Sequence, residues 1–95
     1  MVLSFQIVKI QSGLSRVATL SGGLVVTEPA IYSSIEDAIR EEAVAVPPGF
    51  AHFADVNYGG ASSGTLPLQS LSARATQVAD QLVSVVAEMH RIAEA

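Results

Sequence analysis

The C-terminal third of the chain carries the pattern that most restricts its fold. From Pro67 onward there is no glycine and no further proline, and apolar residues recur at alternating spacings of three and four. These residues are Leu68, Leu71, Ala75, Val78, Leu82, Val85, Met89 and Ile92. Such a heptad repeat is typical of a helix that packs lengthwise against another element. Pro67 suits the first turn of this helix, and Thr65 is a candidate N-cap.

The length of the predicted helix indicates either self-association or a break. About 28 residues at 1.5 Å per residue make a rod of roughly 40 Å, whereas a compact chain of 95 residues is nearer ~30 Å across. An unbroken helix would overhang the sheet or pack along a second copy, most simply in a twofold dimer. A bend or break near residues 72–76 is another solution. In the plainest alternative, the repeat packs wholly on the chain's own sheet and short helix.

The composition also favours an oligomer. Hydrophobic residues make up 49% of the chain and charged residues only 15%, with a mean hydropathy of +0.43. A monomer of this size normally covers its surface with more charge. We therefore expect part of the apolar surface to lie in the interface of a homodimer or a higher oligomer.

The charge of the chain argues against two classes of partner. The net charge is −4, and the five cationic residues are scattered along the sequence. Binding to a nucleic-acid backbone or to an anionic membrane takes a cluster of basic residues. We therefore expect neither a nucleic-acid polymer nor a membrane as partner.

The compartment is predicted from equally general features. The chain has no cysteine, which excludes disulfides and thiolate zinc sites and is compatible with the cytosol. Its first residues do not read as a signal peptide, and no uncharged apolar run approaches the ~18 residues of a membrane span. We expect a cytoplasmic protein.

Before residue 67 the patterns alternate between strand and helix. Period-two or short β-branched runs bounded by turn residues predict strands, and a 3.6-residue period predicts one short helix. The strands are expected at 2–11, 14–20, 24–27 and 50–58, and the helix at 35–43. The fold class is therefore α+β, with a small antiparallel sheet, one short helix and a long C-terminal amphipathic helix. It forms a single domain, in which residues 1–66 give the sheet and short helix and residues 67–95 the long helix.

Three local predictions refine this outline. The apolar pattern of the first strand shifts phase at Val8, which indicates burial on both faces or a bulge near Ile7 and Val8. Ser33 and Glu36 have the spacing of a capping box at the start of the short helix. Residues 44–46 are a candidate for one further brief strand.

The glycine- and serine-rich segment before the last helix is the candidate ligand site. Gly59, Gly64 and Thr65 match part of the phosphate-loop pattern, but its lysine is missing, so an NTPase is rejected. A loop of this kind at a helix N-terminus can still present backbone N–H groups to an anion. A cation, a stacking ring and an amide lie nearby. The predicted set for a small phosphorylated or nucleotide-like ligand is Asn57, Tyr58, Gly59, Gly60, Ser62, Ser63, Thr65 and Arg74.

Two functional classes follow, and neither is an enzyme. One is an oligomeric binding protein that captures or sequesters this small ligand; the other is a protein-interaction or inhibitor module without one, using apolar surface such as residues 43–53. His52 and Asp55 would point to opposite faces of a strand, so they are poorly placed as a catalytic pair. No spacing of histidines and carboxylates predicts a metal site, and no cofactor is expected. Glu41 and Glu42 are interpreted as a solvated helix end.

Overall fold

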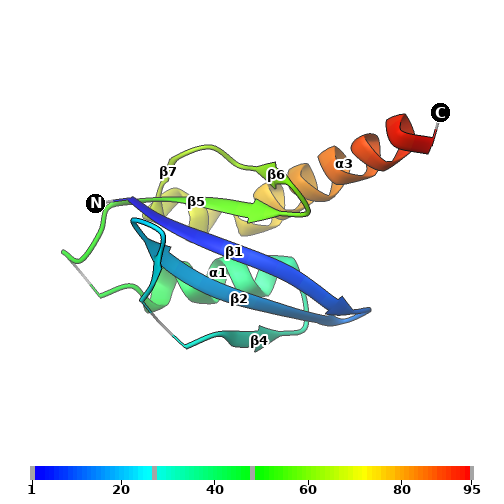
Figure 1. Cartoon of the computed structure of the whole chain (residues 1–95). Coiled ribbons are helices and arrows are strands. Elements are labelled where there is room, and N and C mark those ends of the chain that lie inside the picture. Colours follow the sequence, from blue (N-terminus) through cyan, green and yellow to red (C-terminus); the bar gives the residue numbers. More distant parts are fainter. Residues whose placement is uncertain (1, 27, 48, 95) are drawn as a thin grey trace.

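The sheet of the protein is mixed, and its centre is a long antiparallel hairpin. The structure, a computed structural model, describes residues 2–26, 28–47 and 49–94 (Figure 1). The hairpin pairs β1 (Val2–Gln11) with β2 (Leu14–Ser21). The other edge of β1 pairs in parallel with β5 (Phe53–Tyr58). The α+β fold class is confirmed, but the sheet is not purely antiparallel.

Short strands extend both sides of this centre. β3 (Leu24–Val25) and β4 (Ala30–Tyr32) both pair with β2, while β6 (Ala61–Ser62) and β7 (Leu66–Pro67) both pair with β5. Their pairing with the longer strands is antiparallel throughout. The predicted strand at 24–27 is therefore shorter than expected, with residue 27 outside the described part of the chain. The strand predicted at 50–58 begins only at Phe53.

The phase shift in β1 has a different cause from the one predicted. Leu3, Phe5 and Ile7 are buried, and Val8 lies on the opposite, open face of the sheet. Pairing with β2 is regular as far as Lys9 and shifts only between Lys9 and Gln11. The prediction of a bulge near Ile7 and Val8, or of burial on both faces, is therefore wrong. Val8 is an apolar residue on an uncovered face.

The crossover from β4 to β5 contains α1 (Ile35–Ala45). Its N-cap is Ser34, whose Oγ accepts a hydrogen bond from the Asp37 backbone N–H at 3.1 Å. The predicted capping box on Ser33 is thus displaced by one residue, and the Ser33 hydroxyl instead donates to the Asp37 carboxylate at 3.0 Å. Residues 44 and 45 continue the helix, so the brief strand predicted at 44–46 is wrong.

The C-terminal helical pattern is divided into two helices. α2 (Leu68–Ala73) ends at Arg74, and α3 (Ala75–Glu94) follows directly. The break falls inside the interval 72–76 that the length argument predicted. Thr65 is not the cap: Leu66 and Pro67 form β7, so α2 starts later, with Pro67 as an N-cap that makes no side-chain bond.

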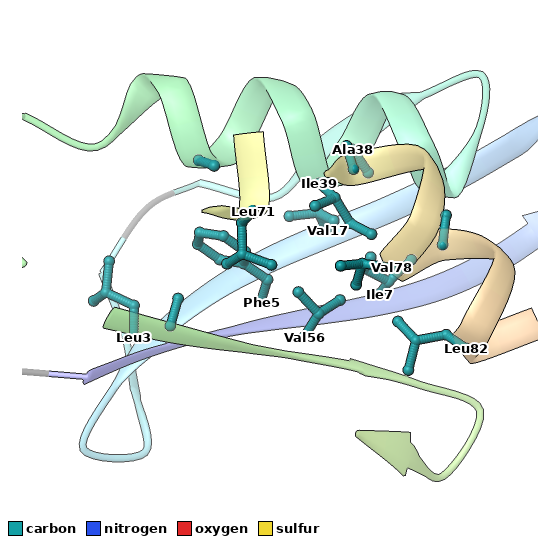
Figure 2. Close-up of a cluster of buried hydrophobic side chains, with 14 of the residues drawn as sticks. Leu3, Phe5, Ile7, Val17, Ala38, Ile39, Val56, Leu71, Val78 and Leu82 are labelled. Atoms are coloured by element: carbon teal, nitrogen blue, oxygen red, sulfur yellow. The ribbon is translucent and has the colours of Figure 1, made fainter. Parts of the chain in front are cut away.

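The core lies between the sheet and the three helices, which pack on one of its faces (Figure 2). Phe5 and Val56 from the sheet meet Ile39 from α1, Leu71 from α2 and Leu82 from α3, and all five are fully buried. Burying side chains of this size is the main stabilising contribution of a small domain. The break at Arg74 lets α2 and the start of α3 both contribute to this core.

The second half of α3 extends past the sheet (Figure 1). The molecule measures 45 Å along its longest axis and 25 by 22 Å across. The helix therefore combines two of the predicted solutions, because it is broken near its start and still overhangs the fold.

Candidate functional site

The glycine-rich segment is a hairpin turn held against α3. Gly59 and Gly60 join β5 to β6 and have φ angles of 57° and 88°, which favour glycine. A Cβ atom on Gly59 would lie 3.0 Å from Cγ2 of Val86, and one on Gly60 would lie 3.3 Å from the Met89 Cε. The two glycines thus allow the turn to approach α3 closely, which gives them a structural role whether or not a ligand binds.

The serines of this segment hold it to β5. The Ser63 hydroxyl accepts from the Val56 N–H at 2.9 Å and donates to the Gly64 carbonyl at 2.8 Å, and the Ser63 N–H donates to the Val56 carbonyl at 2.9 Å. The Ser62 hydroxyl accepts from the Gly64 N–H at 3.1 Å. The Ser63 hydroxyl and the N–H groups of Ser63 and Gly64, which the ligand hypothesis would direct at an anion, therefore already have partners. Thr65 is exposed beyond it, and β7 separates the segment from α2.

The other predicted ligand residues are distributed over both faces of the sheet. Asn57 lies on the open face, where its amide donates to the Asp55 carboxylate at 2.8 Å. Tyr58 is half-buried and packs against the core. Arg74 is at the break between α2 and α3, and its Nε donates to the Gln77 side-chain oxygen at 2.8 Å. The tyrosine, the amide and the cation therefore do not surround one position.

Ser63 and Arg74 are the part of the set that the fold brings together. Both line a hollow of about 80 Å³ between the β6–β7 segment and the helix break. Its other polar lining residues are Ser70, Gln77 and Gln81. Its volume is below the ~300–1,000 Å³ of typical sites for drug-sized ligands.

The second half of α3 carries three exposed members of the heptad repeat, which we call the distal stripe: Val85, Met89 and Ile92. These side chains are 41%, 43% and 71% exposed. They continue the repeat whose earlier members, Val78 and Leu82, are buried against the domain. The heptad repeat thus continues beyond the last residue of α3 that is buried in the core.

The face of the sheet opposite the helices is also uncovered. Exposed apolar side chains there include Val2 and Val8 of β1 and Phe53 of β5. Between them lie the polar side chains of Gln6 and Asn57, which are paired in register across β1 and β5. This face is therefore more mixed in polarity than the distal stripe.

Sequence reasoning missed Glu42. Its carboxylate accepts hydrogen bonds from the Thr19 hydroxyl and the Tyr32 hydroxyl, both at 3.3 Å. Burial, and after it the charge of Glu42, raises the pKa of Tyr32. The sequence feature that indicates partial burial of Glu42 is its spacing. Glu42 follows the buried Ile39 by three residues and so lies on the inner side of α1. The interpretation of Glu42 as a solvated helix end is wrong.

Glu36 connects the start of α1 with the start of α3. Its carboxylate accepts from the Thr76 hydroxyl and pairs with Arg40 at 2.6 Å, as the i,i+4 spacing predicts. The hydrogen bond from Thr76, followed by that from Arg40, lowers the pKa of Glu36. This contact holds the first turn of α3 beside α1.

Comparisons with family models, curated proteins and solved structures find no match to this chain. None of the helices that the structure describes is long and apolar enough to cross a membrane. Among residues 2–26, 28–47 and 49–94, no three histidine, aspartate or glutamate side chains are grouped so as to hold a metal ion.

Proposed function

We propose that this chain is a non-enzymatic protein-interaction module that works as a homodimer, joined through the distal stripe of α3. One observation carries the proposal: the heptad spacing continues through Val85, Met89 and Ile92 beyond the last buried residue, Leu82, and these side chains are exposed although the Met89 methyl group still reaches the β5–β6 turn. A 3,4 repeat is the pattern that one helix presents to another helix.

A second copy is the partner that fits this stripe best. The stripe is apolar, and the charged Glu88 and Arg91 beside it pair with each other within the helix. The surface therefore has no unpaired charge that a partner would have to neutralise. The same apolar stripe on a second molecule is complementary to it. Twofold interfaces of this self-complementary kind are the commonest in soluble oligomers.

The packing of α3 on its own domain favours an antiparallel pair. Val78 and Leu82 belong to the same heptad repeat and lie against the body of the protein, so the body occupies this side of the first half of the helix. In a parallel pair both bodies would sit at the same height between the two helices and collide. In an antiparallel pair the overhanging halves overlap and the bodies lie at opposite ends.

The proposal is tested by sedimentation equilibrium on matched variants. Val85→Asp with Met89→Asp puts two negative charges on the stripe, and Ser84→Asp with Ala87→Asp puts the same two charges on exposed positions of α3 outside the stripe. We expect the stripe variant to sediment as a monomer of 9.9 kDa and the control to sediment as the wild type does, at twice that mass. A stripe variant that keeps the dimer mass would contradict this assignment of the interface.

The direction of pairing has its own test, because a chain without cysteine accepts single cysteines cleanly. If the pair is centred near residue 88, Ile92 and its copy lie roughly 12 Å apart along the axis and Met89 and its copy only about 3 Å. A short bismaleimide should therefore link the Met89→Cys dimer efficiently and the Ile92→Cys dimer poorly. Equal linking of both would indicate a parallel pair.

A second candidate is capture of a small anion in the hollow that Ser63 and Arg74 share. The supporting observation is that Arg74 and Ser70 line this hollow together with Ser63. Titration calorimetry with inorganic phosphate should then give saturable binding that Arg74→Ala abolishes while the fold is kept. If phosphate gives no binding heat with the wild-type protein, the hollow is not an anion site.

We propose a cytoplasmic location for both candidate functions.

A further inference from the structure

We propose that the hollow at the C-terminal end of α1 binds a small molecule in which an apolar group carries a protonated amine. The hollow has a volume of about 220 Å³. It is lined by Leu3, Thr19, Val26, Glu42, Ala45, Val46, Pro47 and Phe50. This inference is independent of the proposed dimer, since none of its residues belongs to the distal stripe.

The walls of the hollow are apolar, with a single carboxylate among them. Leu3 is buried at one side, whereas Phe50 is 45% exposed and lies where the hollow meets solvent. An apolar pocket with a few placed polar groups is the usual form of a small-molecule site. Since this hollow is below the ~300–1,000 Å³ of drug-sized sites, its ligand would be smaller than a drug-sized molecule.

Within residues 2–26, 28–47 and 49–94, two donors engage the carboxylate of Glu42 and leave part of its acceptor capacity unused. It accepts one hydrogen bond from Thr19 and one from Tyr32, whereas an ionised carboxylate offers about four acceptor positions. The two hydroxyls fix the carboxylate at the wall of the hollow, and the remaining positions are available to a donor inside it. An ammonium group supplies such donors and makes the stronger, charge-assisted kind of hydrogen bond.

The surrounding charge also selects a cation. Glu42 lies in the last turn of α1, where the helix dipole is negative and a basic residue would be favourable, yet this turn has none. None of the described residues that line the hollow is a cation. A bound amine would offset this unfavourable concentration of negative charge. The ring of Phe50 at the rim can add a cation–π contact or cover the apolar group.

The test compares three ligands of one shape on the intact protein. Amide spectra of the ¹⁵N-labelled chain are recorded during titration with 2-phenylethylamine, 2-phenylethanol and phenylacetate. We expect the amine to bind with a Kd near or below about 1 mM and to shift the amide signals of Thr19, Val46 and Phe50. The neutral alcohol should bind at least about tenfold more weakly, since it lacks the charge-assisted bond, and the acid should not bind.

Matched variants distinguish a direct contact between the amine and the Glu42 carboxylate from a general effect of net charge on binding. Glu42→Gln keeps the size of the side chain and should weaken binding of the amine by about tenfold or more. Glu41→Gln removes the same charge from an exposed neighbour outside the hollow and should leave binding nearly unchanged. Spectra of both variants without ligand show whether each is folded. Equal affinity for amine and alcohol, no saturable shift with the amine, or no loss in folded Glu42→Gln would overturn the proposal.

Discussion

The close approach of the β5–β6 turn to α3 gives the sharpest test of the fold. Gly59→Ala adds a methyl group 3.0 Å from Val86, at a φ of 57°. Gly22→Ala, in the turn between β2 and β3, adds the same group at a φ of 60° with nothing within 4 Å. Both changes incur about 1–2 kcal/mol of left-handed strain, offset by about 0.4–1 kcal/mol from the stiffer unfolded chain. Only Gly59→Ala also overpacks a contact, which costs about 1–3 kcal/mol more.

Urea unfolding at one protein concentration measures this difference. We expect Gly22→Ala to lower the free energy of unfolding by about 0–1.5 kcal/mol and Gly59→Ala by about 1–4 kcal/mol. Combining Gly59→Ala with Val86→Ala should recover about 1 kcal/mol or more as a coupling energy, because the second change removes the atoms in the clash. Equal losses for the two glycine variants, with no coupling to Val86, would refute the reasoning.

Three further predictions concern the helices. Ser34→Ala should lower the free energy of unfolding by about 1 kcal/mol through loss of the N-cap. Ser33→Ala removes only an exposed hydrogen bond and should change it by about 0.5 kcal/mol or less, and denaturant curves of both variants distinguish the two serines. Leu71→Ala removes a fully buried side chain of α2 and should cost about 2–5 kcal/mol in the same assay. The lowered pKa of Glu36 means that its contribution to stability is present above its ordinary value of 4.5 and is lost as pH falls through the folded-state pKa. Thr76→Val should move that pKa upward in an NMR titration, and an unchanged pKa would show that the hydroxyl is not its main cause.

Local patterns were sufficient to predict most of the elements. Alternation located β1 to its residue bounds, and the 3.6-residue period located α1 to within two residues at its C-terminal end. The parallel pairing of β1 with β5 was not predicted, because it joins segments more than 40 residues apart and depends on the α1 crossover. The residue pattern within a strand does not specify which distant strand it pairs with.

The break at Arg74 shows the same limit within a helix. No glycine or proline occurs there, and each residue near it tolerates helical backbone. The break follows from tertiary constraints, because β7 fixes the start of α2 on β5 while the core requires both Leu71 and Val78. Length alone indicated that such a break was one solution.

The candidate site was predicted only in part. The residue types near Gly59 are suited to binding an anion. However, alternation along β5 places Asn57 and Tyr58 on opposite faces of the sheet. Of the predicted set, only Ser63 and Arg74 line the same hollow. The Glu42 hollow was missed because it is assembled from α1, β1, β2 and the segments that follow β3 and α1. Only the tertiary structure brings these segments together.

The oligomeric state of the wild-type chain tests the central claim most directly. Sedimentation equilibrium over a range of concentrations measures the mass without assuming a shape. A dimer burying the distal stripe predicts a mass of twice 9.9 kDa at high concentration, with dissociation on dilution. A mass of 9.9 kDa up to the highest concentration would show that the exposed stripe of α3 is not a self-association surface and would contradict the account.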